Sequence, residues 1–325
     1  MQSWRVVLKP MAYFDLQLNG YAGIDFNGDV LDRASLEMVC QRLESQGVGG
    51  ILATVITDSI DVMEGRLGRI ATLLEDHPEL QRVIRGFHVE GPFINPNPGY
   101  RGAHPEDAII PADTSLMERL LAAGRGFVRL VTLAPEFDSG LKVTRLLSDR
   151  GIVVSAGHTD ASLDQLRAAI DNGLTMFTHV GNGCPASMPR HDNIIQRVLS
   201  LRGRLWLCFI ADGVHIPFFV LSNYLDLIGL EKTIVVTDGI AASDLGPGRY
   251  TLGRWELNIG DDLIARSPDG SHLLGSTVTM PRTFHNLTGI LGLSEASARL
   301  LMEGNPHRAL ANAFKDDPFR IPTAG

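Results

Sequence analysis

Five separate segments of the chain run an apolar, β-branched stretch into a residue that can bind a metal ion or transfer a proton. The segments and these residues are VIRGFHVE (Glu90), IVVSAGH (His158), TMFTH (His179), LWLCFIADGVH (Asp212 and His215) and TIVVTD (Asp238). In a parallel α/β protein such stretches are buried strands, and the functional side chains gather where the strands end. The pattern therefore predicts one shared active site.

Strand-like and helix-like segments alternate along the chain, as in a parallel sheet built from βα units. The expected strands are Tyr13–Leu18 and residues 49–57, 83–91, 127–136, 152–159, 175–180, 205–213 and 233–239. Helices are expected over residues 31–45, 115–123, 141–148 and 163–172, with a further one running to Leu74. Eight strands in this alternation predict a (β/α)8 TIM-like barrel, and we expect residues 1–325 to form a single domain.

The stretch between Pro247 and Leu274 interrupts the alternation. Its sequence is typical of short strands with turns at Gly260-Asp261 and Asp269-Gly270. It predicts a small β insertion after the eighth strand, followed by two helices over residues 279–291 and 294–304.

Composition limits the partners and the compartment. A formal net charge of -8 disfavours nucleic acid and leaves a small molecule as the expected partner. The three cysteines, Cys40, Cys184 and Cys208, show no CxxC spacing, which indicates a reducing compartment without disulfides. No segment approaches the run of about 18 apolar residues that a membrane span needs, and no signal peptide is recognisable. We expect a cytoplasmic protein without membrane contact.

Glu90, His158 and His179 offer one carboxylate and two imidazoles, the donor set of a catalytic zinc site that leaves a position open. A metal bound in this way lowers the pKa of water and polarises a carbonyl, which suits hydrolysis of an amide or ester. Asp238 would then take the proton of the water and deliver it to the leaving group.

Each of these residues also has a structural interpretation. A single histidine in an apolar run is usually a packed, hydrogen-bonded residue, and a lone aspartate after a strand is usually a helix N-cap. Their joint occurrence at strand ends favours function. The roles of His88 and Asp212 stay open, and Cys184 is expected to pack rather than to act as a nucleophile.

Nine motifs occur in a characteristic order: DLQLNGYAG, HVEGPF, GYRGAH, LAPE, SAGHTDA, THVGN, ADGVH, VVTDG and LLGSTVTM. Together they resemble the N-acetylglucosamine-6-phosphate deacetylase family of the amidohydrolase superfamily, over roughly residues 13–310. The resemblance implies that Glu90, His158 and His179 bind the metal and that Asp238 is the catalytic acid and base. It further implies substrate contacts, which are His104 at the acetyl carbonyl, His215 near the sugar phosphate, Asn182, Gly183 and the phosphate-binding Arg190.

The chain departs from the family pattern at three places. Gln17 and Asn19 stand where many amidohydrolases carry two histidines for a second metal, so we expect one divalent ion, with zinc as the expected metal. MPRHDN replaces a segment in which paired histidines precede the phosphate-binding arginine, which weakens the phosphate assignment. Only short segments flank the barrel, so the family's terminal β-sandwich should be absent or vestigial.

Arg190 also has a structural interpretation, as part of a solvated turn in which Asp192 caps the next helix. As a phosphate ligand it could be joined by Arg101 and Arg197, and the resemblance suggests that a homodimer partner donates it.

The sequence as a whole predicts a metal-dependent enzyme that removes the acetyl group from an N-acetylated amino sugar, with the 6-phosphate of N-acetylglucosamine as the expected substrate. The alternatives are hydrolysis of an N-acyl amino acid or a cyclic amide, and a catalytically silent sugar-binding barrel. The metal, the phosphorylation state, the sugar epimer and the oligomeric state are left open.

Overall fold

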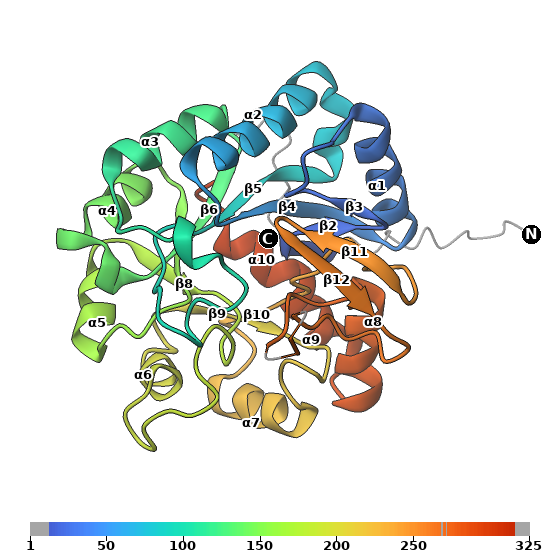
Figure 1. The fold of residues 1–325 in the computed structure, drawn as a ribbon. Coiled ribbons are helices and arrows are strands. Elements are labelled where there is room, and N and C mark those ends of the chain that lie inside the picture. Colours follow the sequence, from blue (N-terminus) through green and yellow to red (C-terminus); the bar gives the residue numbers. More distant parts are fainter. Residues whose placement is uncertain (1–12, 268, 271, 316–325) are drawn as a thin grey trace, which may run out of the picture.

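The computed structural model describes residues 13–267, 269–270 and 272–315. Eight strands form one sheet in the order β1-β4-β5-β6-β7-β8-β9-β10, and all neighbouring pairs are parallel. The strands are β1 Tyr13–Leu18, β4 Val48–Ile56, β5 Ile84–Glu90, β6 Val128–Leu133, β7 Val153–Ala156, β8 Leu174–Phe177, β9 Trp206–Ile210 and β10 Thr233–Val236. The eight predicted strands are confirmed, and Figure 1 shows them as a ring surrounded by helices.

The ring closes between the first and last strands. A parallel bridge joins Leu18 to Gly239, and the Asn19 amide donates to the Gly239 carbonyl at 2.7 Å. Below this bridge the buried Asp15 carboxylate accepts hydrogen bonds from the Thr237 amide at 3.1 Å and the Thr237 hydroxyl at 2.5 Å. Side-chain hydrogen bonds therefore replace the ladder that a longer β1–β10 pairing would supply.

Helices surround the ring. They are α1 Arg33–Ser45, α2 Ile60–Asp76, α3 Thr114–Ala123, α4 Lys142–Asp149, α5 Leu163–Asp171, α6 Ile194–Ser200, α7 Phe218–Ile228, α8 Met280–His285, α9 Glu295–Arg299 and α10 Asn305–Ala309. The last of them, α10, packs at the amino-terminal end of the ring, where His307 contacts Phe14. The two helices predicted after the insertion are present, but each continues as a π-helical turn, at Asn286–Ile290 and Leu300–Gly304. No helix in the described part of the chain is long and apolar enough to span a membrane.

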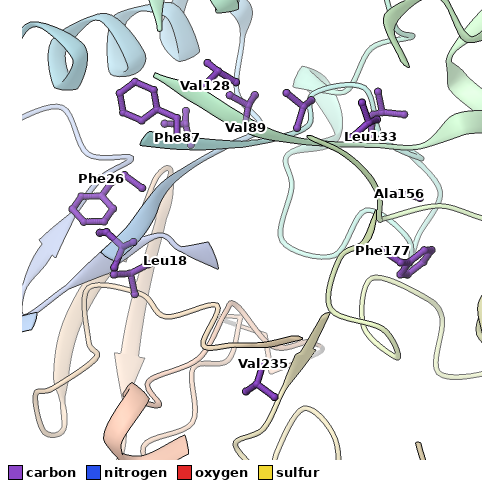
Figure 2. Packing of buried hydrophobic residues seen from close by; sticks show 14 of the residues in the cluster. Leu18, Phe26, Phe87, Val89, Val128, Leu133, Ala156, Phe177 and Val235 are labelled. Atoms are coloured by element: carbon purple, nitrogen blue, oxygen red, sulfur yellow. The ribbon is translucent and has the colours of Figure 1, made fainter. Parts of the chain in front are cut away.

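Side chains alternate across each strand, because successive residues point to opposite faces. Outward residues such as Val89, Val128 and Leu133 fill the layer between the ring and the helices, and Figure 2 shows Val89 of β5 beside Val128 of β6. Inward residues form a second apolar cluster at the amino ends of the strands, which includes Phe14 and Leu16. The segment after α10 adds Leu310 and Phe314 to this cluster, so the amino-terminal end of the barrel is plugged.

The predicted insertion is an antiparallel hairpin of β11 Gly248–Leu252 and β12 Trp255–Ile259. Its own turn, at Gly253 and Arg254, was not among the predicted turns. A second small sheet pairs β2 Gly20–Tyr21 with β3 Ile24–Asp25. The prediction about a terminal sandwich concerns residues 1–12 and 311–325. Residues 311–315 form a turn, and residues 1–12 and 316–325 lie outside the described residues.

Candidate metal centre and its surroundings

The carboxyl ends of four strands bring the predicted residues together. Glu90 is the last residue of β5, and His158, His179 and Asp238 each lie two positions after the end of β7, β8 and β10. The backbone φ angles of the last three are 51°, 31° and 51°, in the left-handed region that non-glycine residues rarely adopt. Such conformations cost about 1–3 kcal/mol each and persist only where the surroundings hold them, which is common at functional sites.

Three side-chain atoms converge on one point. Glu90 Oε1 lies 3.1 Å from His179 Nε2 and 3.3 Å from His158 Nε2, and the two imidazole nitrogens are 3.1 Å apart. Tetrahedral zinc with ligands at about 2.1 Å would hold its ligand atoms about 3.4 Å apart. The buried oxygen and two nitrogens therefore fit a divalent cation in both chemistry and spacing.

The surroundings fix the orientation of His158. Its Nδ1 lies 2.7 Å from the Tyr100 carbonyl oxygen, so Nδ1 carries the proton and Nε2 faces the cluster with a lone pair. Gly102 and Gly183 flank the ring, and a Cβ added at either would come within 3.2 Å of it. Both glycines have positive φ, so a larger residue there would strain the backbone and displace the ligand.

The cluster shifts the ionisation of its members. Burial alone would raise the pKa of Glu90, but hydrogen bonds with His158 and His179 outweigh it and hold the pKa well below the usual range. Burial would lower the pKa of His179, yet its contact with Glu90 raises that pKa. A carboxylate that is ionised while buried needs positive charge beside it, which a bound cation would provide.

Gln17 and Asn19 donate to the carboxylates of the site. Gln17 Nε2 lies 3.1 and 3.2 Å from the two oxygens of Glu90, and Asn19 Nδ2 lies 2.7 Å from Asp238 Oδ1. These amide N–H groups point at the acidic groups and cannot serve as metal ligands. The two amides thus stabilise the negative charge of the carboxylates they contact.

Asp238 is partly buried beside this cluster. Burial, followed by the negative charge of Glu90, raises its pKa to about 7. Its backbone is held from two sides, because its carbonyl accepts from the Ser276 amide at 2.8 Å and the preceding Thr237 is bonded to Asp15.

His104 reaches the site from the loop after β5. The Thr57 hydroxyl lies 2.7 Å from its Nδ1 and 3.1 Å from the Glu90 carbonyl oxygen. The His104 ring packs edge-on against His158 with centroids 4.4 Å apart, and potential ligand atoms of Glu90, His104 and His158 lie within 4.8 Å of one another. Thr57 was not predicted, because a threonine at the end of an apolar strand carries no signal of function.

Comparison with known proteins identifies the family. No family model matches the chain. An N-acetylglucosamine-6-phosphate deacetylase from Bos taurus is 34% identical in an alignment of 299 residues that covers 90% of this chain and 71% of that protein. The chain belongs to the N-acetylglucosamine-6-phosphate deacetylase family. An N-acetylgalactosamine-6-phosphate deacetylase from Escherichia coli O157:H7 is 29% identical, over 92% of this chain and 77% of its own length.

Solved structures of N-acetylglucosamine-6-phosphate deacetylases share the fold. A Mycobacterium smegmatis deacetylase variant, in complex with N-acetyl-D-glucosamine-6-phosphate, superposes with a TM-score of 0.83 at 28% identity, covering 92% of this chain and 77% of its own. The deacetylase from Thermotoga maritima gives 0.82 at 27% identity, covering 96% and 81%.

The loop after β8 carries three of the predicted substrate-binding residues, and the structure places them differently from one another. Asn182 and Gly183 lie beside the metal-binding cluster, and the buried Asn182 Nδ2 finds no hydrogen-bond partner among the described residues. Arg190 is exposed on the same loop, and its guanidinium makes no ion pair or hydrogen bond within the described part of the chain. The structure does not bring Arg190 to the cluster.

The other two arginines considered for phosphate are already paired. Arg101 contacts Glu106 at 3.1 Å, and Arg197 contacts Asp160 at 2.9 Å and Asp192 at 2.6 Å. The interpretation of Asp192 as the helix cap is wrong. Asn193 caps α6 by accepting from the Gln196 amide, and this leaves Asp192 to pair with Arg197.

Asp212 holds His215. Its carboxylate accepts from the Val214 and His215 amides, each at 2.8 Å, and lies 2.7 Å from His215 Nδ1. Burial would raise the pKa of Asp212, but the bonds from His215 outweigh it and lower the pKa. Asp212 is therefore a turn former that orients His215.

His88 and Cys184 lie outside the metal-binding cluster. His88 Nε2 bonds the Thr132 hydroxyl at 2.7 Å inside the barrel, and burial lowers its pKa to about 4. Burial raises the pKa of Cys184 to about 11, which keeps it a packed thiol, as expected.

Glu136, in the LAPE motif, has a role that the sequence did not reveal. It accepts from Asn95 Nδ2 at 3.0 Å and the Asp160 amide at 2.7 Å, and it also bonds the Thr159 hydroxyl. It thereby ties the loop after Glu90 to the loop that carries His158. The LAPE motif was the only sequence signal for Glu136, and it does not reveal this role because the partners of Glu136 lie on two other loops.

Proposed function

We propose that this protein removes the acetyl group of an N-acetylated amino sugar, with N-acetylglucosamine 6-phosphate as the substrate. The observation that carries the proposal is the convergence of Glu90 Oε1, His158 Nε2 and His179 Nε2 within 3.3 Å, with the partly buried Asp238 beside them, in a chain of this deacetylase family. A binding protein would need neither a ligand cluster with an open side nor an acid and base beside it.

In this proposal Glu90, His158 and His179 hold one divalent metal ion, zinc by preference. When bound, the ion would polarise the acyl carbonyl and lower the pKa of water. Gln17 and Asn19 support one ion per chain, since their N–H groups face the two carboxylates. Elemental analysis of active protein should give about one tightly bound ion per chain, and two would refute this part of the proposal.

Asp238 moves the proton in the proposed reaction. It accepts a proton from the attacking water as the water oxygen bonds to the acyl carbon. It then gives that proton to the departing amine nitrogen as the carbon–nitrogen bond breaks, which yields acetate and the free amino sugar. Asn19 keeps the Asp238 carboxylate oriented throughout, through the contact at 2.7 Å.

His104 stabilises the acyl oxygen in the proposed reaction. In this structure the Thr57 hydroxyl donates to the Glu90 carbonyl oxygen, so its oxygen accepts from His104 Nδ1. Donation from Nε2 to the acyl oxygen, as negative charge develops there, requires the other tautomer, in which the Thr57 hydroxyl turns to donate to Nδ1. Asn182, Gly183 and His215 are proposed substrate contacts, and the unpartnered Asn182 Nδ2 supports this role because a sugar hydroxyl or acyl oxygen would satisfy it.

Arg190 is the proposed phosphate ligand, presented across a homodimer. Its exposure and lack of an ion partner within the described residues suit a guanidinium that completes a neighbouring site. Arg190→Ala should raise KM for a 6-phosphorylated sugar about tenfold and leave the unphosphorylated sugar unchanged. Arg249→Ala, at another exposed arginine, is the matched control. Equal effects on both sugars would remove Arg190 from phosphate recognition.

Met188 and Pro189, in place of the family's paired histidines, favour a second candidate, hydrolysis of an unphosphorylated amide on the same centre. We also propose a cytoplasmic location, which rests on the three unpaired cysteines.

Acetate release by the metal-loaded protein tests these functions. The panel is N-acetylglucosamine and N-acetylgalactosamine, each with and without the 6-phosphate, together with an N-acetyl amino acid. We expect the 6-phosphosugars to be hydrolysed at least a hundredfold faster by kcat/KM. Turnover of the amino acid alone would replace the proposal by the second candidate, and no turnover of any compound would favour a silent barrel.

A further inference from the structure

The β11–β12 hairpin contacts the loop that carries His104. Trp255 Nε1 donates to the Ala103 carbonyl at 2.7 Å, one residue before His104. Arg254 Nη1 bonds both carboxylate oxygens of Asp107, at 2.8 and 3.0 Å, three residues after His104. Two consecutive hairpin residues therefore hold this loop on both sides of His104.

Arg254 also reaches the strand end that supports the ring of His104. Its Nε donates to Asp58 Oδ1 at 3.0 Å, and its Nη2 contacts the same oxygen. Asp58 follows Thr57, whose hydroxyl lies 2.7 Å from His104 Nδ1. The guanidinium thus bridges the two segments that together set the position of the imidazole.

The two arms of this bridge differ in strength. The side chain of Asp58 is 4% exposed and that of Asp107 is 73% exposed. An exposed ion pair contributes little because water screens it, whereas the shielded Asp58 carboxylate receives two N–H groups of Arg254 on one oxygen. We therefore expect the Asp58 arm to fix the guanidinium, and the Asp107 arm to limit the opening of the loop.

The hairpin itself is anchored to the barrel. Its inward residues Leu252, Leu257 and Ile259 pack in one buried cluster with Ile56 and Ile240, close to the ends of β4 and β10. The Gly253 amide donates to Asp25 Oδ2 at 2.8 Å, and Figure 1 shows the hairpin in orange beside β2 and β3. A rigid support of this kind can fix the position of the His104 loop, whose nearest regular element is the single 3-10 turn Glu106–Ala108.

We propose that the β11–β12 hairpin is a clamp that positions His104, with Arg254 and Trp255 as its positioning residues. The inference deepens the proposed function, because the consequence for turnover rests on the role of His104 at the acyl oxygen. Neither hairpin residue needs to touch substrate. Both act by limiting where the imidazole can lie relative to the metal-binding cluster.

Hydrogen exchange and kinetics of Arg254→Gln and Trp255→Phe test the clamp. Amide exchange in peptides covering residues 99–108 should become about tenfold faster in Arg254→Gln and a few-fold faster in Trp255→Phe. For the 6-phosphosugar, kcat should fall about tenfold in Arg254→Gln while KM stays within about twofold. The lysine of Arg254→Lys lacks the planar guanidinium that bridges two carboxylates, so the kcat of this variant should lie between those of Arg254→Gln and the wild type.

Arg266→Gln is the matched control, because it breaks an exposed ion pair to Asp262 in the same insertion, at 2.7 Å, without contacting the His104 loop. In a His104→Gln background, Arg254→Gln should reduce kcat no further, since both changes act through one group. The clamp is overturned if amide exchange over residues 99–108 is unchanged in Arg254→Gln. It is also overturned if Arg254→Gln lowers kcat as much in the His104→Gln protein as in the wild type. If His104→Gln itself keeps full turnover, the proposed role of His104 fails, while the exchange data still decide whether the clamp exists.

Discussion

The two ends of the barrel interior are built from the same strands and differ in what they contain. At the amino-terminal end, inward side chains such as Leu16 and Met176 form a closed apolar cluster. At the carboxyl-terminal end, inward positions and the residues just beyond them carry the buried Glu90 and His179 and the partly buried Asp238. The first arrangement stabilises the fold by removing apolar surface from water. The second destabilises it, because charged groups lose water and residues are held in the left-handed region.

Strand β8 shows the contrast over three residues. Met176 points into the apolar cluster and is fully buried, whereas His179, just beyond the strand, faces Glu90. If the ends are specialised as described, substitutions at these two positions should affect different properties. Residues that stabilise the fold and residues that form the site therefore lie at different heights along the strand axis, so one set can be changed without the other.

The largest expected effect is that of His179→Ala. It removes one of three converging ligand atoms, so metal and activity should be lost together, with kcat/KM down by at least about a thousandfold. Elemental analysis and acetate release measure the two losses. Because a strained left-handed histidine is replaced, the unfolding free energy of the metal-free protein should change by less than about 1 kcal/mol. Full activity with bound metal would exclude His179 as a ligand.

Met176→Ala should do the opposite. Truncating a fully buried methionine leaves a cavity in the plug and should lower the free energy of unfolding by about 2–5 kcal/mol. The folded fraction should keep its metal content and its kcat within about twofold. Urea unfolding followed by circular dichroism gives the first value. A tenfold fall in kcat without loss of stability would show that the two ends are not separable.

Asp238→Asn tests the charge at the functional end without removing a proposed ligand. We expect kcat to fall at least about a hundredfold, while metal and substrate still bind, because the amide cannot accept the proton. Asn19→Ala, which removes the contact at 2.7 Å, should give a smaller loss. Near-normal turnover of Asp238→Asn would remove this residue from the mechanism.

The smallest effect concerns a titratable group at the apolar end. His307 of α10 packs edge-on against Phe14, and burial, with the charge of Arg85, lowers its pKa to about 4. Below about pH 6.5 the unfolded chain takes up a proton that the folded chain does not, so this group costs stability as the pH falls towards 4. Above that range its contribution to stability is complete.

The stability lost between pH 7 and pH 5 should therefore be smaller in His307→Gln than in the wild type, by roughly 1–2 kcal/mol. His191→Gln, at an exposed histidine, is the control and should follow the wild type. Urea unfolding at both pH values measures the difference. Identical pH dependence in all three proteins would mean that His307 titrates normally.

Much of the fold and part of the site were predictable from the sequence. Apolar, β-branched runs gave the eight strands to within a few residues, because burial on both faces leaves a local signature. Glu90, His158, His179 and Asp238 stood out since each ends such a run. Parallel strands alone bring such residues to one end of the barrel, and Glu90, His158 and His179 lie within 3.3 Å of one another there.

Other features depend on contacts between distant parts of the chain. The turn at Gly253 and Arg254 was missed, and the partners of Arg254 and Trp255 lie about 150 residues or more away. Thr57 and Glu136 became visible only through the groups they bond. Residue types of this kind have many ordinary uses, so their sequence neighbours do not reveal their role.

The sequence by itself determined the period of the strands, their number and the chemistry placed at their ends. These properties are local, since they depend on which side chains follow which. The tertiary structure alone decided the left-handed backbone at His158, His179 and Asp238, the orientation of Gln17 and Asn19 towards the carboxylates, and the exposure of Arg190. Each of these reflects packing and hydrogen bonding between segments that only the closed barrel brings together.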